Sequence, residues 1–226
     1  MWAIIKKEVK SYFLSPVGYV FIGLFLLMAS VFFYLDIIRS GLSNYEYMFY
    51  SLSTILTFIT PILTMRMFAE ERKEGTEQLL FTSPRSLTEI VLGKFFAAVM
   101  ILVISEIFTL FYFVILTFFG NPQILTALTA LFGFLLLGMA YFSFGMFASS
   151  LTENQIIAGI VTIAFFILTW FLPEFSSIFE PFSLITIFTR FPSGQIALNE
   201  IVTLVSFTVL FTILTILVLQ RKKSLK

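Results

Sequence analysis

The sequence predicts an all-α integral membrane protein with six transmembrane helices. Three observations lead to this class: six long apolar stretches, a small share of charged residues, and basic residues gathered on one side of the predicted spans. A hydrocarbon core about 30 Å thick needs roughly 20 helical residues at about 1.5 Å each. The apolar stretches are Val17–Leu35, Phe49–Met65, Phe95–Phe119, Ile124–Ala148, Ile156–Leu172 and Ile201–Leu219. The two shorter stretches reach spanning length by extending into flanking residues.

The composition supports a membrane protein and excludes several functions. The 226 residues are 59% hydrophobic and 12% charged, with a mean hydropathy of +1.01, whereas a soluble domain carries about twice this charge. The absence of cysteine excludes disulfides and thiol chemistry, and the absence of histidine removes the commonest general base and metal ligand. A net charge of +1 makes a nucleic-acid partner unexpected.

The basic residues predict the orientation. With six spans both termini lie on one side, and twelve of the fourteen Lys and Arg residues then fall on that side, leaving only Arg39 and Arg190 on the other. By the positive-inside rule the termini are cytoplasmic. The N-terminal lysines followed by an apolar run also resemble a signal peptide, but five further spans favour a retained anchor.

The first fifteen residues, Met1–Ser15, predict an amphipathic helix lying on the membrane surface. At 100° per residue its apolar side chains fall within an arc about 100° wide. These side chains are Trp2, Ile5, Val9, Tyr12 and Phe13. We expect this face to enter the lipid boundary, with the lysines toward the head groups. A simple basic flank is the alternative.

The second span carries a stripe of hydroxyl side chains, with Pro61 expected to kink the helix. Ser53, Thr57, Thr60 and Thr64 lie within about 60° of one another at helical spacing. Either they bond to their own backbone or join neighbouring helices, or they form a polar seam along a translocation path. The third span adds Glu106 near mid-depth, which is either a contact in that path or a protonated acid bonded to a neighbouring helix.

The largest cytoplasmic feature connects the second and third spans, over residues 66–94. A charged helix is expected to end at Gly75, a short separate helix to run over Thr76–Phe81 with Thr76 as its N-cap, and Pro84 to close it. Ser86 and Glu89 then form a capping box for the third span. The apolar residues Leu79, Leu80 and Phe81 either bind a protein partner or fold under the bundle.

The later spans add two packing features. Gly138, Phe142, Gly145 and Ser149 form a mostly small face on the fourth span, suited to close helix contact. The segment Pro173–Glu200 is broken by prolines yet rich in phenylalanine, and we expect an external re-entrant helical hairpin there.

No motif supports an enzyme. The only Gly-Lys pair, Gly93-Lys94, lacks the remainder of a phosphate-binding P-loop. Peptidases that use a Ser–His pair and zinc proteases both need histidine. We therefore expect a non-enzymatic membrane component.

The segment from Glu71 to Pro84 (ERKEGTEQLLFTSP), followed by Ile90–Lys94 (IVLGK), resembles the signature of ABC-2 type transporter permeases. The order of elements along all 226 residues is similar to that family's plan, as a single permease domain (1–226). Within the family the chain is most similar to the gliding-motility-associated permease GldF and to NosY-like permeases. It departs at Glu77-Gln78, where many members have a free position and then Glu.

The resemblance implies a role for each part of the cytoplasmic segment. Thr76–Phe81 would be the coupling helix that docks in a separate ATPase, Met1–Ser15 the elbow helix, and the external hairpin a gate. The ATPase-coupling residues would be Glu70, Glu71, Arg72, Glu74, Gly75, Thr76, Glu77, Leu79, Leu80, Phe81 and Pro84. Ser53, Thr57, Thr60, Thr64 and Glu106 would form a candidate translocation seam.

The resemblance also implies partners. These are an ABC ATPase subunit that binds ATP and Mg²⁺, a second permease subunit (identical or related), the lipid membrane, and a periplasmic accessory subunit as a further candidate. This chain itself would hold no cofactor and no metal, and would lie in the bacterial cytoplasmic (inner) membrane. An exporter is favoured over an ATPase-independent carrier or channel and over a membrane scaffold that transmits mechanical work. Fold does not determine the cargo.

Overall fold

The computed structural model describes residues 1–41, 44–78, 85–175 and 182–225. Every regular element within these ranges is helical. The elements are α1 (Trp2–Leu14), α2 (Pro16–Phe32), the π-helix η1 (Phe33–Ile38), α3 (Tyr47–Thr64), α4 (Ala69–Lys73), α6 (Leu87–Thr117), α7 (Ile124–Leu151), α8 (Gln155–Phe175), α9 (Leu184–Phe188) and α10 (Leu198–Leu225). The all-α prediction is confirmed for the described residues.

Within the described residues, six helical segments are long and apolar enough to cross a membrane, as the sequence predicts. They are Pro16–Ile38, Tyr47–Lys73, Leu87–Thr117, Ile124–Leu151, Gln155–Glu174 and Leu198–Ser224. The fifth span extends into flanking residues as expected, because α8 continues through Pro173 to Phe175. The N-cap expected at Ser86 is confirmed, because its hydroxyl accepts the Glu89 backbone N–H at 3.2 Å.

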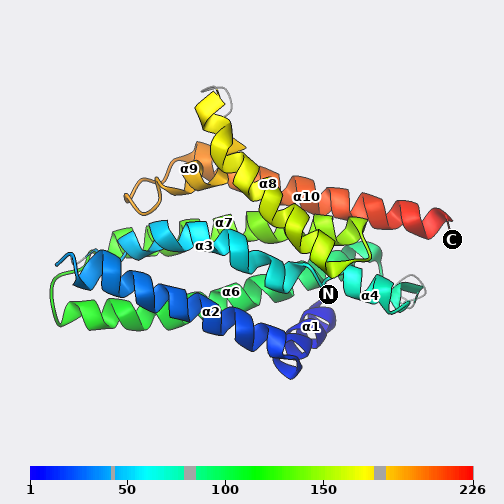
Figure 1. Cartoon of the computed structure of the whole chain (residues 1–226), viewed down its shortest axis with the longest axis horizontal. Coiled ribbons are helices and arrows are strands. Elements are labelled where there is room, and N and C mark those ends of the chain that lie inside the picture. Colours follow the sequence, from blue (N-terminus) through cyan, green and yellow to red (C-terminus); the bar gives the residue numbers. More distant parts are fainter. Residues whose placement is uncertain (42–43, 79–84, 176–181, 226) are drawn as a thin grey trace.

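The long helices follow the long axis of the molecule, with α8 inclined to the rest (Figure 1). Helix α7 packs against α3, α6, α8 and α10. Its small face is used as predicted: a Cβ added at Gly138 would lie 2.1 Å from a methyl of Leu102, and one at Gly145 would lie 2.3 Å from the Thr64 hydroxyl. Glycine at these two positions therefore lets α6 and α3 approach α7 closely.

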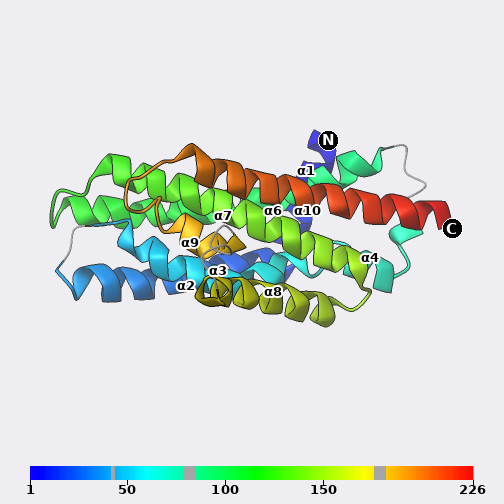
Figure 2. The same ribbon diagram turned by 90° about the horizontal axis from the view of Figure 1, so that it is seen from above.

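Helix α1 crosses the bundle instead of running along it, as the two views show (Figures 1 and 2). The predicted lipid-facing arc is only partly correct. Trp2 is 69% exposed, but Ile5 is buried. A Cβ at Gly93 of α6 would lie 2.6 Å from Ile4, so this glycine makes room for α1 to pack against protein.

The described part of residues 173–200 folds back onto the bundle. Helix α9 contacts α3, α7, α8 and α10, and Phe188 and Phe191 are fully buried. The Phe191 ring fills the notch at Gly133, where a Cβ would lie 2.3 Å from it. Residues 176–181 of the expected hairpin lie outside the described residues.

Candidate functional site

The charged segment after α3 lies at the same end of the bundle as the C-terminus, and α1 lies toward that end (Figures 1 and 2). The sequence predicts one continuous charged helix from the second span to Gly75, but the helix is interrupted between Thr64 and Ala69. The buried Ser149 hydroxyl of α7 lies at this break. It accepts the Phe68 and Ala69 backbone N–H groups, each at 3.1 Å, and donates to the Met65 carbonyl at 3.0 Å.

This arrangement satisfies three backbone groups that the break removes from the helical hydrogen-bond pattern. Ser149 therefore fixes the direction in which α4 leaves α3. The sequence identified Ser149 only as part of a packing face, because its backbone partners are distant in the chain.

Arg72 joins α4 to the end of α7. Its side chain is 12% exposed and lies 3.3 Å from the Glu77 carboxylate. The guanidinium also donates to the carbonyls of Ser150 at 3.2 Å and Leu151 at 3.4 Å. Because the C-terminus of a helix carries partial negative charge, a cation is stabilised at this position. Lys222 of α10 donates to the same Ser150 carbonyl at 2.5 Å.

Lys94 joins two other helices, α4 and α1, from within the apolar helix α6. Its side chain is 5% exposed, and its ammonium lies 2.8 Å from Glu71 of α4 and 3.3 Å from Glu8 of α1. It also lies 5.6 Å from the centre of the Phe68 ring. A lysine in such a stretch needs acidic partners, so its position was a usable signal. Sequence reasoning used Lys94 as a basic residue of the cytoplasmic side and as part of the IVLGK motif, and did not predict its acidic partners.

Two further contacts order this region. Arg66 forms an ion pair with Glu70, its Nε donating at 2.8 Å. The Tyr12 hydroxyl of α1 donates to the Leu63 carbonyl of α3 at 3.3 Å. Burial, together with the nearby Glu8 carboxylate, raises the pKa of the Tyr12 phenol, so it remains a neutral donor.

The predicted coupling residues meet this network in part. Gly75 adopts a left-handed backbone, with φ of +73°, which ends α4 as predicted. The Thr76 hydroxyl donates to the Glu71 carbonyl at 3.2 Å, and Glu77 is buried. Four predicted residues, Leu79, Leu80, Phe81 and Pro84, lie outside the described residues, so their docking role stays a prediction.

The hydroxyl stripe of α3 is buried inside the chain. Ser53, Thr60 and Thr64 each donate to a carbonyl of α3 itself, and Thr57 donates to the Tyr141 hydroxyl of α7 at 3.3 Å. These contacts correspond to the packing alternative that the sequence left open. A part in translocation stays a prediction for these four residues.

Glu106 lies apart from the charged segment. It is 6% exposed, and its buried Oε1 has no hydrogen-bond partner among the described residues. On the same helix, the Thr109 hydroxyl donates to the Glu106 main-chain carbonyl at 2.7 Å and shares a hydrogen bond of 2.7 Å with Tyr45. The side-chain bond to a neighbouring helix that the sequence suggested is thus absent from the described part, and the translocation role stays a prediction.

Comparison with known proteins gives one result. No curated protein matches the chain. A family model described as an ABC-2 family transporter protein matches residues 34–219, which is more than half of the sequence and includes the charged segment, four of the six candidate spans in full and parts of the other two. The chain therefore belongs to the ABC-2 family of transporter proteins.

Proposed function

We propose that the protein is the membrane-spanning permease subunit of an ATP-driven exporter, moved by a separate ATPase subunit bound at residues 66–84. The family supports the permease role and implies an ABC ATPase partner in the membrane assembly. ATP and Mg²⁺ would be bound by that partner.

One observation carries the proposal: the segment around α4 is joined by buried charges to three helices. Lys94 connects Glu71 to Glu8 of α1 and lies on α6, while Arg72 binds the end of α7. A force on this segment would thus reach α1, α6 and α7 together. Such a shared junction is what coupling between an ATPase site and a membrane path requires.

The residues divide into two groups in this proposal. Leu79, Leu80 and Phe81, with Pro84 after them, supply the apolar surface that docks in the ATPase. Transmission into the bundle falls to the remaining coupling residues, which are Glu70, Glu71, Arg72, Glu74, Gly75, Thr76 and Glu77. ATP binding by the partner would then shift this junction between two arrangements.

We further propose that the termini face the cytoplasm of a bacterial inner membrane, since twelve of fourteen basic residues fall on that side. Two permease subunits would enclose the path, with α1 as the elbow helix and residues 173–200 as the external gate. A periplasmic accessory subunit and a GldF-like or NosY-like role remain parts of the same proposal.

The test is co-purification with the candidate ATPase, encoded beside this gene or expressed with it. The variant Leu79→Glu/Leu80→Glu should abolish association, because two buried carboxylates would oppose an apolar contact. Leu198→Glu, at the start of α10 and 77% exposed, is the matched control and should keep it. Flux of solute in vesicles holding both subunits then measures export.

Association that survives the double substitution would remove the docking assignment. Flux by the permease alone, without ATPase or ATP, would instead identify a carrier or channel. ATP-driven movement of a partner without any solute flux would identify a mechanical transmitter.

A further inference from the structure

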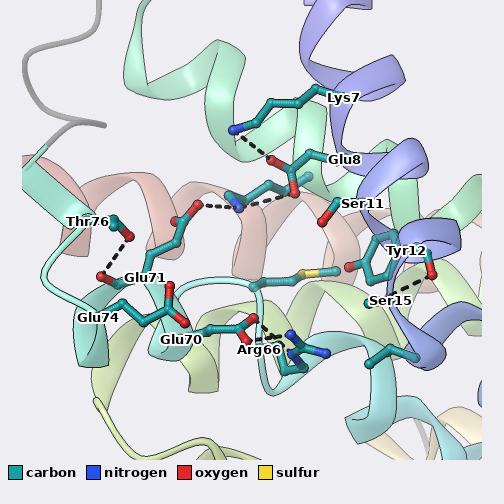
Figure 3. Close-up of a pocket in the computed structure, with 13 residues that line it drawn as sticks. Lys7, Glu8, Ser11, Tyr12, Ser15, Arg66, Glu70, Glu71, Glu74 and Thr76 are labelled. Atoms are coloured by element: carbon teal, nitrogen blue, oxygen red, sulfur yellow. Dashed lines mark hydrogen bonds and ion pairs between the residues drawn. The ribbon is translucent and has the colours of Figure 1, made fainter.

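A cavity of about 490 Å³ opens between α1 and the charged segment. Glu70, Glu71 and Glu74 lie along one side and Lys7, Glu8 and Ser11 along the other (Figure 3). Helix α1 crosses the bundle at this level, and Val17 at the start of the first span also lines the cavity. The cavity therefore lies where α1 meets the ends of two candidate spans, and with α1 as the proposed elbow helix on the membrane surface this would be the depth of lipid head groups.

The charges of the cavity do not balance. Three cations and four carboxylates line it. Lys94 is shared between Glu8 at 3.3 Å and Glu71 at 2.8 Å. It uses only one oxygen of Glu71, and the other, Oε2, is fully buried with no hydrogen-bond partner among the described residues. A buried carboxylate oxygen without a donor is costly.

A second carboxylate is also left over. Arg66 is paired with Glu70, whereas Glu74 forms no ion pair within the described part of the chain, although it lies beside Glu70 at the cavity (Figure 3). Glu71 and Glu74 are three residues apart and therefore on one helical face. One wall of the cavity thus carries two carboxylates, of which Glu74 has no cation partner among the described residues.

The other wall suits an anion beside a cation bound at those carboxylates. The Lys7 side chain is 74% exposed, with its ammonium 3.9 Å from the Glu8 carboxylate, and the Ser11 hydroxyl makes no hydrogen bond to a described residue. A zwitterion with a primary ammonium next to a phosphate matches both walls. A wholly anionic head group would face the surplus carboxylates.

We propose that this cavity binds the head group of phosphatidylethanolamine, with the ammonium at Glu71 and Glu74 and the phosphate at Lys7 and Ser11. The inference rests on the proposed position of α1 at the membrane surface, and it does not depend on the ATPase. It adds a lipid-binding site to the proposed coupling junction, so that lipid and ATPase would act on the same region of the chain.

The experiment uses the purified full chain in vesicles with equal amounts of phosphatidylethanolamine and phosphatidylcholine of identical acyl chains. Bound lipids are counted by native mass spectrometry. Choline keeps the positive charge but has no N–H, so the preference for ethanolamine measures the hydrogen bonds. We expect a preference of about five- to tenfold, which is within the range of one net hydrogen bond.

Glu74→Gln is the main variant, because it breaks no ion pair with a described residue and should fold, and Glu71→Gln is the second. Each should reduce the preference to about twofold or less, since a neutral amide holds an ammonium more weakly. Glu153→Gln is the control, with an equal change of charge at a side chain that is 72% exposed and lies outside the cavity. It should keep the wild-type preference.

Equal binding of the two lipids by the wild type overturns the proposal, as does a preference that survives both glutamine variants. An ATPase lysine in place of the lipid would give no lipid preference and a loss of ATPase co-purification in the same variants, and this also overturns it. The lipids are counted on the permease without the ATPase. The lipid result can therefore be interpreted even if the proposed ATPase association fails.

Discussion

The molecule buries polar side chains in two ways, along the middle of α3 and at the junction around α4. In the hydroxyl stripe of α3, three of four side chains bond to their own helix. At the junction, Lys94, Arg72 and Ser149 each bond to a different element. A hydroxyl that bonds to its own helix places no constraint on the neighbouring helices. A buried ion pair, in contrast, fixes the relative position of the elements it joins. Burial of polar groups is therefore informative here only where the partner is remote in the sequence.

The largest effect should come from Lys94→Met. It leaves Glu71 and Glu8 without their shared cation, and breaking a buried pair costs about 3 kcal/mol. We expect a lower midpoint of unfolding in detergent, measured by thermal denaturation. Adding Glu71→Gln to this variant should recover part of the loss, and a fully additive double mutant would show that the pair is not coupled.

Ser149→Ala should come next, at about 2 kcal/mol, because it removes the hydroxyl that serves three backbone groups at the α3–α4 break. The same variant should weaken stimulation of the ATPase by the permease, since α4 would no longer have a fixed direction. Ser143→Ala is the control: it lies two turns earlier on α7, is also fully buried, and bonds only to Ala140 of its own helix. A similar loss in both variants would contradict the special role of Ser149.

Gly145→Ala tests whether the stripe is a packing surface. Its Cβ would lie 2.3 Å from the Thr64 hydroxyl, and overpacking of this kind costs about 1–2 kcal/mol. Thr64→Ala in the same chain should relieve part of the strain. An unchanged stability in Gly145→Ala would mean that α3 and α7 separate easily, as expected for a path that opens.

The smallest effect should come from Thr60→Val, below about 0.5 kcal/mol, because the lost hydrogen bond is internal to α3 and valine is close to threonine in volume. Solute flux in vesicles should also be unchanged if the stripe only packs. A marked loss of flux at unchanged stability would favour the translocation seam instead.

The sequence predicted the six spans and the Ser86 cap because both depend on local patterns of hydropathy and hydrogen bonding. It missed the break after Thr64, since Pro61 and the charged residues gave no sign of a hydroxyl from α7. It likewise missed the partners of Lys94, which lie 86 and 23 residues away. The lipid-facing arc of α1 was misjudged because Gly93 of α6 has no side chain, which lets α1 pack against α6 instead of facing only lipid.

The hydrogen bonds to the Ser150 carbonyl limit how a partner subunit can bind at the C-terminal end of α7. The last turn of a helix leaves four carbonyls without intrahelical donors, and such groups can accept hydrogen bonds from a binding partner. Arg72 and Lys222 already occupy Ser150 from two directions, and Arg72 takes Leu151 as well. The last two carbonyls of α7 are thus already hydrogen-bonded within the chain. A partner subunit that binds at this end must therefore recognise the shape of the surface and its side chains, and not these two backbone carbonyls.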